Sequence, residues 1–233
     1  LSLHDALPIY QRFMKRLRKK FSGYQSVDYK GKLIYPIRFY HCGEYGDKSS
    51  RPHYHACIFN FDFPDKQLWS IRDGIRLYTS KELEKLWPYG FSTIGDVTFE
   101  SAAYVARYVM KKITGKNSEN HYKALDIDTG EILDRKPEYC TMSRSPGIAH
   151  WWYEKYKDDV YPHDYVVVNG KKMKPPKYYD GILETQRPYE FEDIKEKRLT
   201  DADKYADNNT PERLKVRQEI CNAKLGKLKR DKI

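Results

Sequence analysis

Two neighbouring segments rich in aromatic and β-branched residues most constrain how this chain can fold. They span residues 33–45 and 53–61, and residues 46–52 form a short turn-rich loop between them. Such segments are typical of strands, and a short loop with glycine and proline reverses the chain direction. We therefore expect a pair of neighbouring antiparallel strands, whose apolar faces require covering elements.

An amphipathic helix is predicted before the strand pair. Its apolar positions recur at helical spacing among six lysines and arginines, so that one side is apolar and the outer side is basic. The apolar positions are Tyr10, Phe13, Leu17 and Phe21. The basic side is compatible with contacts to phosphates, and equally with an ordinary solvated face.

Three further elements are predicted after the strand pair. A short helix near residues 80–87 begins at the cap Ser80, a strand is expected over residues 91–97, and a longer helix runs from the cap Thr98 to about residue 114. The order helix, strand, strand, helix, strand, helix predicts an α+β domain with a central antiparallel sheet and packed helices.

The remainder of the chain is predicted to form an appendage. Hairpin turns are expected at residues 128–130 and 169–170, and a final basic helix begins at Thr210 with a proline in its first turn. A stretch rich in proline and lysine, residues 171–177, marks the boundary between a core domain over 10–170 and a basic annex over 171–233. Residues 1–9 do not match the pattern after them, and we interpret them as a foreign start.

The charge balance favours a polyanionic partner. Lysines and arginines number 43 against 33 acidic residues, which gives a formal charge of +10, and nucleic acid is the leading candidate. No apolar run approaches the roughly 18 residues of a membrane span, and no secretory signal is apparent. The four cysteines, Cys42, Cys57, Cys140 and Cys221, lack the spacing of a zinc finger or a disulfide framework. We expect a protein without a membrane partner or a small-molecule cofactor.

A pair of histidines lies in the second predicted strand. The period of two places His53 and His55 on one face and Tyr54 on the other, toward packed helices. This short pattern alone is compatible with metal binding or with hydrogen-bonded structural histidines. Glu44 ends the preceding strand and could complete a three-ligand site for a hard divalent ion such as Mg²⁺ or Mn²⁺. His41 is an alternative ligand.

Two tyrosines and a lysine share one side of the helix that begins at Thr98. At about 100° per residue, Tyr104, Tyr108 and Lys111 lie opposite the apolar stripe that we expect to face the core. A phenol oxygen can attack a phosphodiester, and a nearby ammonium can stabilise charge that develops on the phosphate. Amphipathic tyrosines on a partly exposed helix are the alternative interpretation.

These motifs together resemble those of the HUH endonucleases, which carry paired histidines and a tyrosine nucleophile. The pair Tyr104 and Tyr108 is similar to that of the two-tyrosine replication initiators of microviruses. The segments 39–59, 91–97 and 141–148 look specifically like the gokushovirus version. The resemblance covers about residues 13–156 well and the following tail more loosely.

The resemblance implies an RRM-like or ferredoxin-like sheet domain and a set of roles. His53, His55 and Glu44 would be metal ligands for Mg²⁺ or Mn²⁺, Tyr104 and Tyr108 nucleophiles, and Lys111 an electrostatic assistant. It also implies an apolar strand before the first helix, where this sequence has residues 1–9 instead.

The implied function is rolling-circle replication initiation by metal-dependent nicking and rejoining of single-stranded origin DNA through a 5′-phosphotyrosyl intermediate. The implied partners are the viral origin and the host replication machinery, in the cytoplasm of a bacterial host. Three alternatives remain at this stage: a non-catalytic single-stranded nucleic-acid-binding protein, an HUH transposase or relaxase, and a metal hydrolase that uses activated water.

Overall fold

The computed structural model describes residues 3–22, 36–46, 51–108, 112–125 and 130–227. The chain divides into two compact units, Leu1–Ile148 and Ala149–Ile233. The boundary predicted from the sequence at residue 170 therefore lies inside the second unit. Each unit has its own hydrophobic core.

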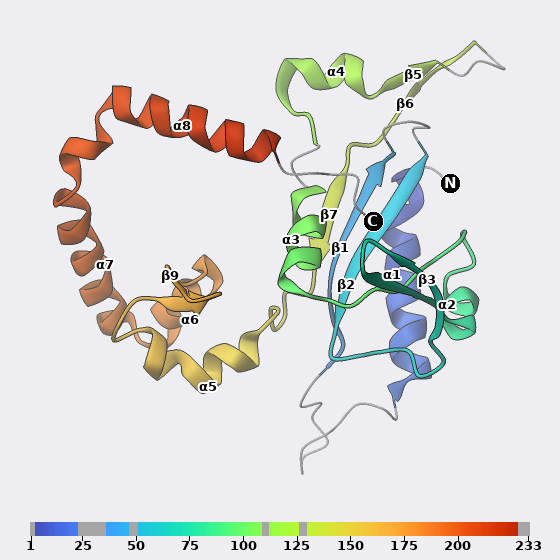
Figure 1. The fold of residues 1–233 in the computed structure, drawn as a ribbon, viewed down its shortest axis with the longest axis horizontal. Helices are drawn as coiled ribbons and strands as arrows, with labels where there is room; N and C mark the ends of the chain where they lie inside the picture. Colours follow the sequence, from blue (N-terminus) through green and yellow to red (C-terminus); the bar gives the residue numbers. More distant parts are fainter. Residues whose placement is uncertain (1–2, 23–35, 47–50, 109–111, 126–129, 228–233) are drawn as a thin grey trace. The chain divides into compact units, whose positions relative to one another are not determined.

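A three-stranded antiparallel sheet forms the centre of the first unit (Figure 1). Its strand order is β2-β1-β7, with β1 over Arg38–Tyr45, β2 over Pro52–Phe59 and β7 over Tyr139–Met142. The predicted pairing of the first two strands is confirmed. In their register, Glu44 lies opposite His53 and Cys42 lies opposite His55.

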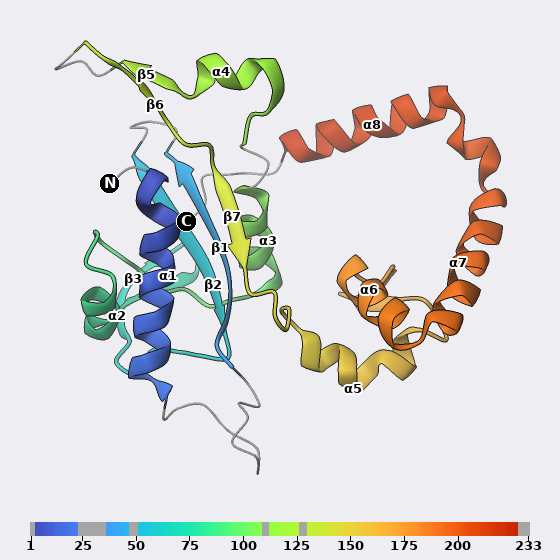
Figure 2. The ribbon, with the colours of Figure 1, turned by 180° about the vertical axis from the view of Figure 1, so that it is seen from behind.

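Helix α1 (Leu3–Lys20) covers one face of this sheet (Figure 2). The four apolar residues predicted from the helical spacing are all buried, and they pack with Ile37 and with α2. The predicted amphipathic helix is therefore confirmed. It begins at Leu3 and buries Ile9, so most of the segment that we interpreted as foreign continues this helix and forms no strand.

Helix α3 (Phe99–Arg107) lies against the other face and starts as predicted. The Thr98 side chain accepts a hydrogen bond from the Ser101 backbone N–H, and the Ser101 hydroxyl accepts one from the Thr98 backbone N–H. The predicted end near residue 114 is wrong, because Tyr108 already caps the helix and residues 112–114 are not helical. Lys111 lies outside the described residues.

The prediction that the tyrosine side of α3 faces away from the core is wrong. Tyr104 and Tyr108 are buried with Val105 in a cluster that includes Cys42 and Cys57, whereas Ala106 is exposed. The short cysteine side chains on this face of the sheet leave room for phenol rings, so the helix turns its largest side chains toward the sheet.

A hairpin that the sequence patterns did not predict follows β2. It consists of β3 (Gln67–Arg72) and β4 (Ile75–Thr79), with its turn at Asp73 and Gly74, which both have positive φ. The strand expected over residues 91–97 is wrong. Within that segment, two backbone hydrogen bonds of 2.8 Å join Ile94 to Tyr78 and form an isolated bridge.

Helix α2 (Lys81–Leu86) confirms the predicted cap. The Ser80 hydroxyl oxygen accepts from the Leu83 backbone N–H at 3.0 Å and donates to Asp65 at 2.6 Å. After α3, the chain forms η3 (Gly115–Asn117), α4 (Ser118–His121) and a hairpin of β5 (Lys123–Leu125) with β6 (Ile132–Asp134). This hairpin agrees with the predicted turn, of which residues 128 and 129 lie outside the described residues.

The second unit is mainly helical. It contains α5 (His150–Val160), β8 (Val166–Val168), β9 (Lys171–Met173), α6 (Lys177–Gln186), α7 (Pro188–Asp203), η4 (Ala206–Asn209) and α8 (Pro211–Gly226). The hairpin turn at Asn169 and Gly170 is confirmed, with positive φ at both positions. Thr210 caps α8 as predicted, by accepting a hydrogen bond from the backbone of Arg213.

The predicted α+β class, an antiparallel sheet packed against helices, is confirmed. Over the residues that the structure describes, no helix is long and apolar enough to cross a membrane.

Candidate active site

The two faces of β2 are used as the strand period predicts. Ile58 packs against the α1 core, and the ring of Tyr54 contacts Trp87 on the same side. His55 points the other way and contacts the rings of Tyr104 and Tyr108. The histidines of β2 therefore lie under α3.

Glu44 and His55 form a direct contact across the two central strands. Their Oε1 and Nε2 atoms are 3.1 Å apart, and Glu44 is buried. A carboxylate oxygen accepts hydrogen bonds, so Nε2 of His55 carries the proton in this arrangement. Two of the three predicted metal ligands are thus in contact.

The ring of His53 has a defined tautomer. Its Nδ1 lies 2.8 Å from the carbonyl oxygen of Arg51, which can only accept, so Nδ1 is the protonated nitrogen and Nε2 presents a lone pair. A carbonyl that fixes the histidine tautomer in this way is typical of metal ligands. The same carbonyl accepts a hydrogen bond of 2.9 Å from the backbone N–H of Gly46.

Gly46 makes room for this ring. A Cβ atom at position 46 would lie 2.6 Å from Cε1 and 2.9 Å from Nδ1 of His53, closer than side chains approach one another in proteins. The absence of a side chain at this position lets the ring lie over the end of β1. Gly46 is thus a positioning residue for His53.

His41 does not share this site. It lies on the α1 face, stacked on Tyr10 with ring centroids 3.5 Å apart, and it is fully buried. Burial, with a smaller contribution from His55, lowers its pKa to about 3. The neutral ring is therefore part of the core, and the alternative of His41 as a ligand is wrong for this geometry.

The two tyrosines meet at their hydroxyl groups. The Tyr108 ring stacks on His55 at 4.4 Å and an angle of 13°, and its hydroxyl donates a hydrogen bond to that of Tyr104. Burial raises the pKa of Tyr108, and the bond to Tyr104 and the charge of Glu44 raise it further. Both groups are placed over the histidine face, with Tyr108 held as a neutral phenol.

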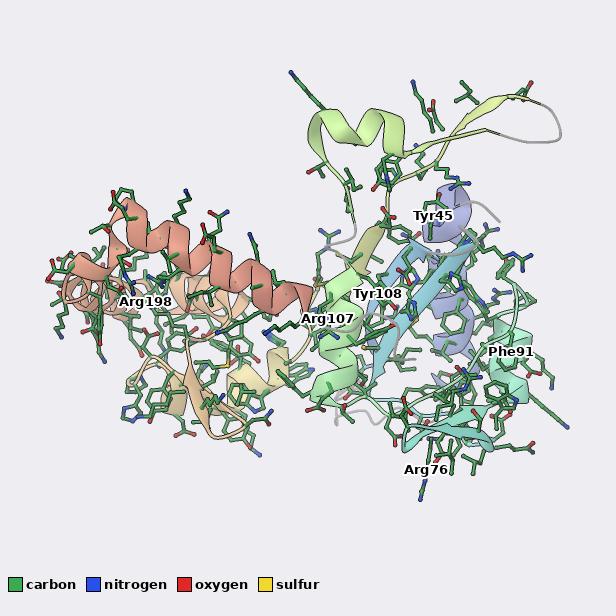
Figure 3. The ribbon with its side chains drawn as sticks, turned by 45° about the horizontal axis from the view of Figure 1, so that its top comes forward. Tyr45, Arg76, Phe91, Arg107, Tyr108 and Arg198 are labelled. Carbon is green, nitrogen blue, oxygen red and sulfur yellow. The ribbon has the colours of Figure 1, made fainter. Side chains whose placement is uncertain are left out.

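Arg107 is a cation that the sequence analysis did not assign. Its guanidinium carbon lies 5.7 Å from the centre of the Tyr104 ring, and its buried Nε has no hydrogen-bond partner among the described residues. Figure 3 shows Arg107 and Tyr108 together on α3. Its position immediately before Tyr108 was the available sequence signal.

The donor set fits a divalent ion only in part. Among the residues that the structure describes, no three His, Cys, Asp or Glu side chains are grouped closely enough to hold a metal ion. Glu44 and His55 are in contact, and His53 presents a lone pair from the same strand. Small rotations of these side chains would be needed to bring the three together.

Comparison with known proteins agrees with this site. The family model for the replication-associated protein ORF2 matches residues 5–113, which contain the histidines, Glu44 and both tyrosines. The chain belongs to the family of phage replication-associated proteins, and the resemblance to microvirus replication initiators is confirmed.

Three relatives are similar over most of this chain. The replication-associated protein VP4 of Bdellovibrio phage phiMH2K is 34% identical over 77% of this chain, and ORF2 of Spiroplasma virus 4 is 35% identical over 80%. ORF4 of Chlamydia phage 1 is 31% identical over 73%. The aligned regions cover 52%, 54% and 39% of these proteins, so the chain spans about half the length of the first two. No solved structure matches the chain.

Proposed function

We propose that this chain is an HUH endonuclease that initiates rolling-circle replication. It would nick and rejoin single-stranded origin DNA through a 5′-phosphotyrosyl intermediate. The observation that carries this proposal is the stacking of Tyr108 on His55, which itself contacts Glu44. This arrangement sets a nucleophilic oxygen type beside a histidine and carboxylate pair, as phosphodiester chemistry requires.

His53, His55 and Glu44 are the residues that would hold Mg²⁺ or Mn²⁺. When bound there, the ion would polarise the scissile phosphate. His53 offers Nε2 without a change of tautomer, because Nδ1 is already the donor to Arg51. His55 would have to release its Nε2 proton or move it to Nδ1 before ligation, because that proton faces Glu44.

One tyrosine then attacks the scissile phosphate. Its phenolic oxygen forms a bond to phosphorus while the bond to the 3′ oxygen breaks. The phenolic proton leaves the tyrosine, and the 3′ oxygen ends as a hydroxyl that the host polymerase extends. The 5′ phosphate remains esterified to the protein, so the bond energy is conserved and no ATP is needed.

The second tyrosine would act after one circuit of synthesis. It attacks the regenerated origin, while the new 3′ hydroxyl attacks the first phosphotyrosyl ester and closes a circle. Tyr104 and Tyr108 are one helical turn apart and already share a hydrogen bond, so both oxygens can address one phosphate.

Cations on the same helix would stabilise the charge of the attacked phosphate. Lys111 was chosen from the sequence for this role, and Arg107 joins it because its guanidinium lies beside Tyr104. We expect that Lys111→Ala and Arg107→Ala each slow adduct formation without preventing metal binding.

The proposed partners are single-stranded viral origin DNA and the replication machinery of a bacterial host cell, in its cytoplasm. Recognition of the origin would use the basic side of α1, residues 143–148 and the basic helix α8.

Denaturing electrophoresis tests this function directly. The protein is incubated with labelled single-stranded origin DNA and Mn²⁺, and we expect label to migrate with the protein. A binding module would give no cleavage, and a hydrolase that uses water would cleave the strand without an adduct. Either result would overturn the proposal. Omission of the metal and His53→Ala, which removes a proposed ligand, are the matched controls.

A further inference from the structure

The β3–β4 hairpin exposes a group of large apolar side chains that the proposed chemistry does not use. Phe91, from the segment bridged to β4, is 68% exposed, and Trp69 in β3 is 46% exposed. Leu68, Ile71 and Ile75 of the hairpin are also exposed. Rings exposed to this extent contribute little to a core, which favours an external binding partner.

The two rings form a defined pair. Trp69 and Phe91 contact each other with centroids 5.0 Å apart and an angle of 61°, which leaves much of the ring surface exposed. The register between β3 and β4 shifts between Leu68 and Ser70, at the position of Trp69. Such an irregularity redirects a side chain and is common beside functional sites.

Two arginines accompany these rings. The guanidinium carbon of Arg72 lies 5.4 Å from the centre of the Trp69 ring, and Arg76 extends from the same hairpin (Figure 3). Neither arginine forms an ion pair with a carboxylate among the described residues, although Asp73 lies in the turn between them. Exposed aromatic rings next to unpaired cations suit bases joined by phosphates.

The hairpin lies on the side of the sheet that carries the candidate active site. Figure 1 shows α3 and the hairpin in front of the sheet, with α1 behind it. Figure 2 shows the opposite view, with α1 in front. A strand that crosses the histidine face from α3 over β2 would therefore continue toward the hairpin.

We propose that Trp69, Arg72, Arg76 and Phe91, together called the hairpin surface, bind single-stranded DNA beside the cleavage site. Bases would stack on the two rings, and the arginines would contact the phosphates. This proposal rests on the proposed function for the identity of the strand. Duplex DNA is a poorer ligand, because its bases are stacked on one another and present no free faces to the rings.

Fluorescence anisotropy with a labelled single-stranded oligonucleotide tests the hairpin surface in the whole chain. Measurements in EDTA separate binding from cleavage. Trp69→Ala and Phe91→Ala should each weaken binding roughly five-fold or more, the low end of the effect of losing one stacked base. Trp69→Tyr keeps a ring and should retain most of the affinity. Arg72→Gln should reduce the slope of log affinity against log salt by about one.

Tyr189→Ala is the matched control, because that ring is 88% exposed in the second unit. It should leave the affinity unchanged. Equal losses in all three alanine variants would overturn the proposal, as would equal losses on single-stranded and duplex DNA. Unchanged DNA affinity in Trp69→Ala and Phe91→Ala, with or without a change of oligomeric state in light scattering, would also overturn it.

The adduct assay on the unmodified chain distinguishes failure of this inference from failure of the proposed function. Adduct formation together with unaltered affinity of both ring variants refutes the hairpin surface alone. Weakened binding in the ring variants without any adduct refutes the nickase and supports a single-strand binding surface.

Discussion

The position of Gly46 leads to a prediction about the metal site that can be measured without cleavage. In Gly46→Ala, the new Cβ would lie 2.6 Å from Cε1 of His53, whereas ordinary contacts begin at 3.4 Å, so the ring must move by about 0.8 Å. That displacement breaks the hydrogen bond from Nδ1 to the Arg51 carbonyl, which fixes the tautomer. Loss of such a supporting contact typically lowers metal affinity roughly 10- to 100-fold, equivalent to about 1.4–2.7 kcal/mol.

Isothermal titration calorimetry with Mn²⁺ measures this effect, and circular dichroism verifies that the variant is folded. Gly95→Ala is the matched control, since its Cβ would meet only the Leu77 side chain, at an ordinary 3.7 Å. We expect Gly95→Ala to bind Mn²⁺ like the unmodified protein. Equal Mn²⁺ affinity in both variants would refute the assignment of His53 as a ligand held by Gly46 and Arg51.

Three further predictions concern chemistry, binding and stability. Tyr104→Phe and Tyr108→Phe should each retain some adduct with labelled origin strand and the double variant none, whereas total loss in one single variant would exclude alternation. Single-stranded DNA binding should weaken steeply with salt, and removal of residues 210–233 should reduce affinity more than adduct formation, as filter binding at several salt concentrations can show. Because burial lowers the pKa of His41 to about 3, the unfolded chain binds a proton that the folded chain does not between the unfolded pKa near 6.5 and pH 3. Stability should therefore fall with decreasing pH, by about 2 kcal/mol at pH 5, and urea titrations of His41→Phe should show a smaller loss.

The sequence was sufficient for the elements whose signals are local. The spacing of Leu17 and its neighbours predicted α1, the side chain of Ser80 predicted the start of α2, and the alternation around His53 predicted which face of β2 carries the imidazoles. Each of these depends on residues within one turn or one strand. The β3–β4 hairpin was missed because it has few buried residues, so its pattern of apolar residues does not alternate.

The burial of the tyrosines could not be predicted from α3 alone, because it depends on what lies across from the helix. Helical periodicity identifies a stripe of small apolar residues, but the sheet face offers Cys42 and Cys57, and phenol rings fill the space above them. The contact of His55 with Glu44 likewise follows from strand register, which pairs residues through a loop of variable geometry. Burial also holds Tyr108 as a neutral phenol whose hydroxyl bonds to Tyr104. A phosphate can reach these oxygens only if that contact opens, so the packing that hides the nucleophiles from sequence analysis also restrains their reactivity until DNA is bound.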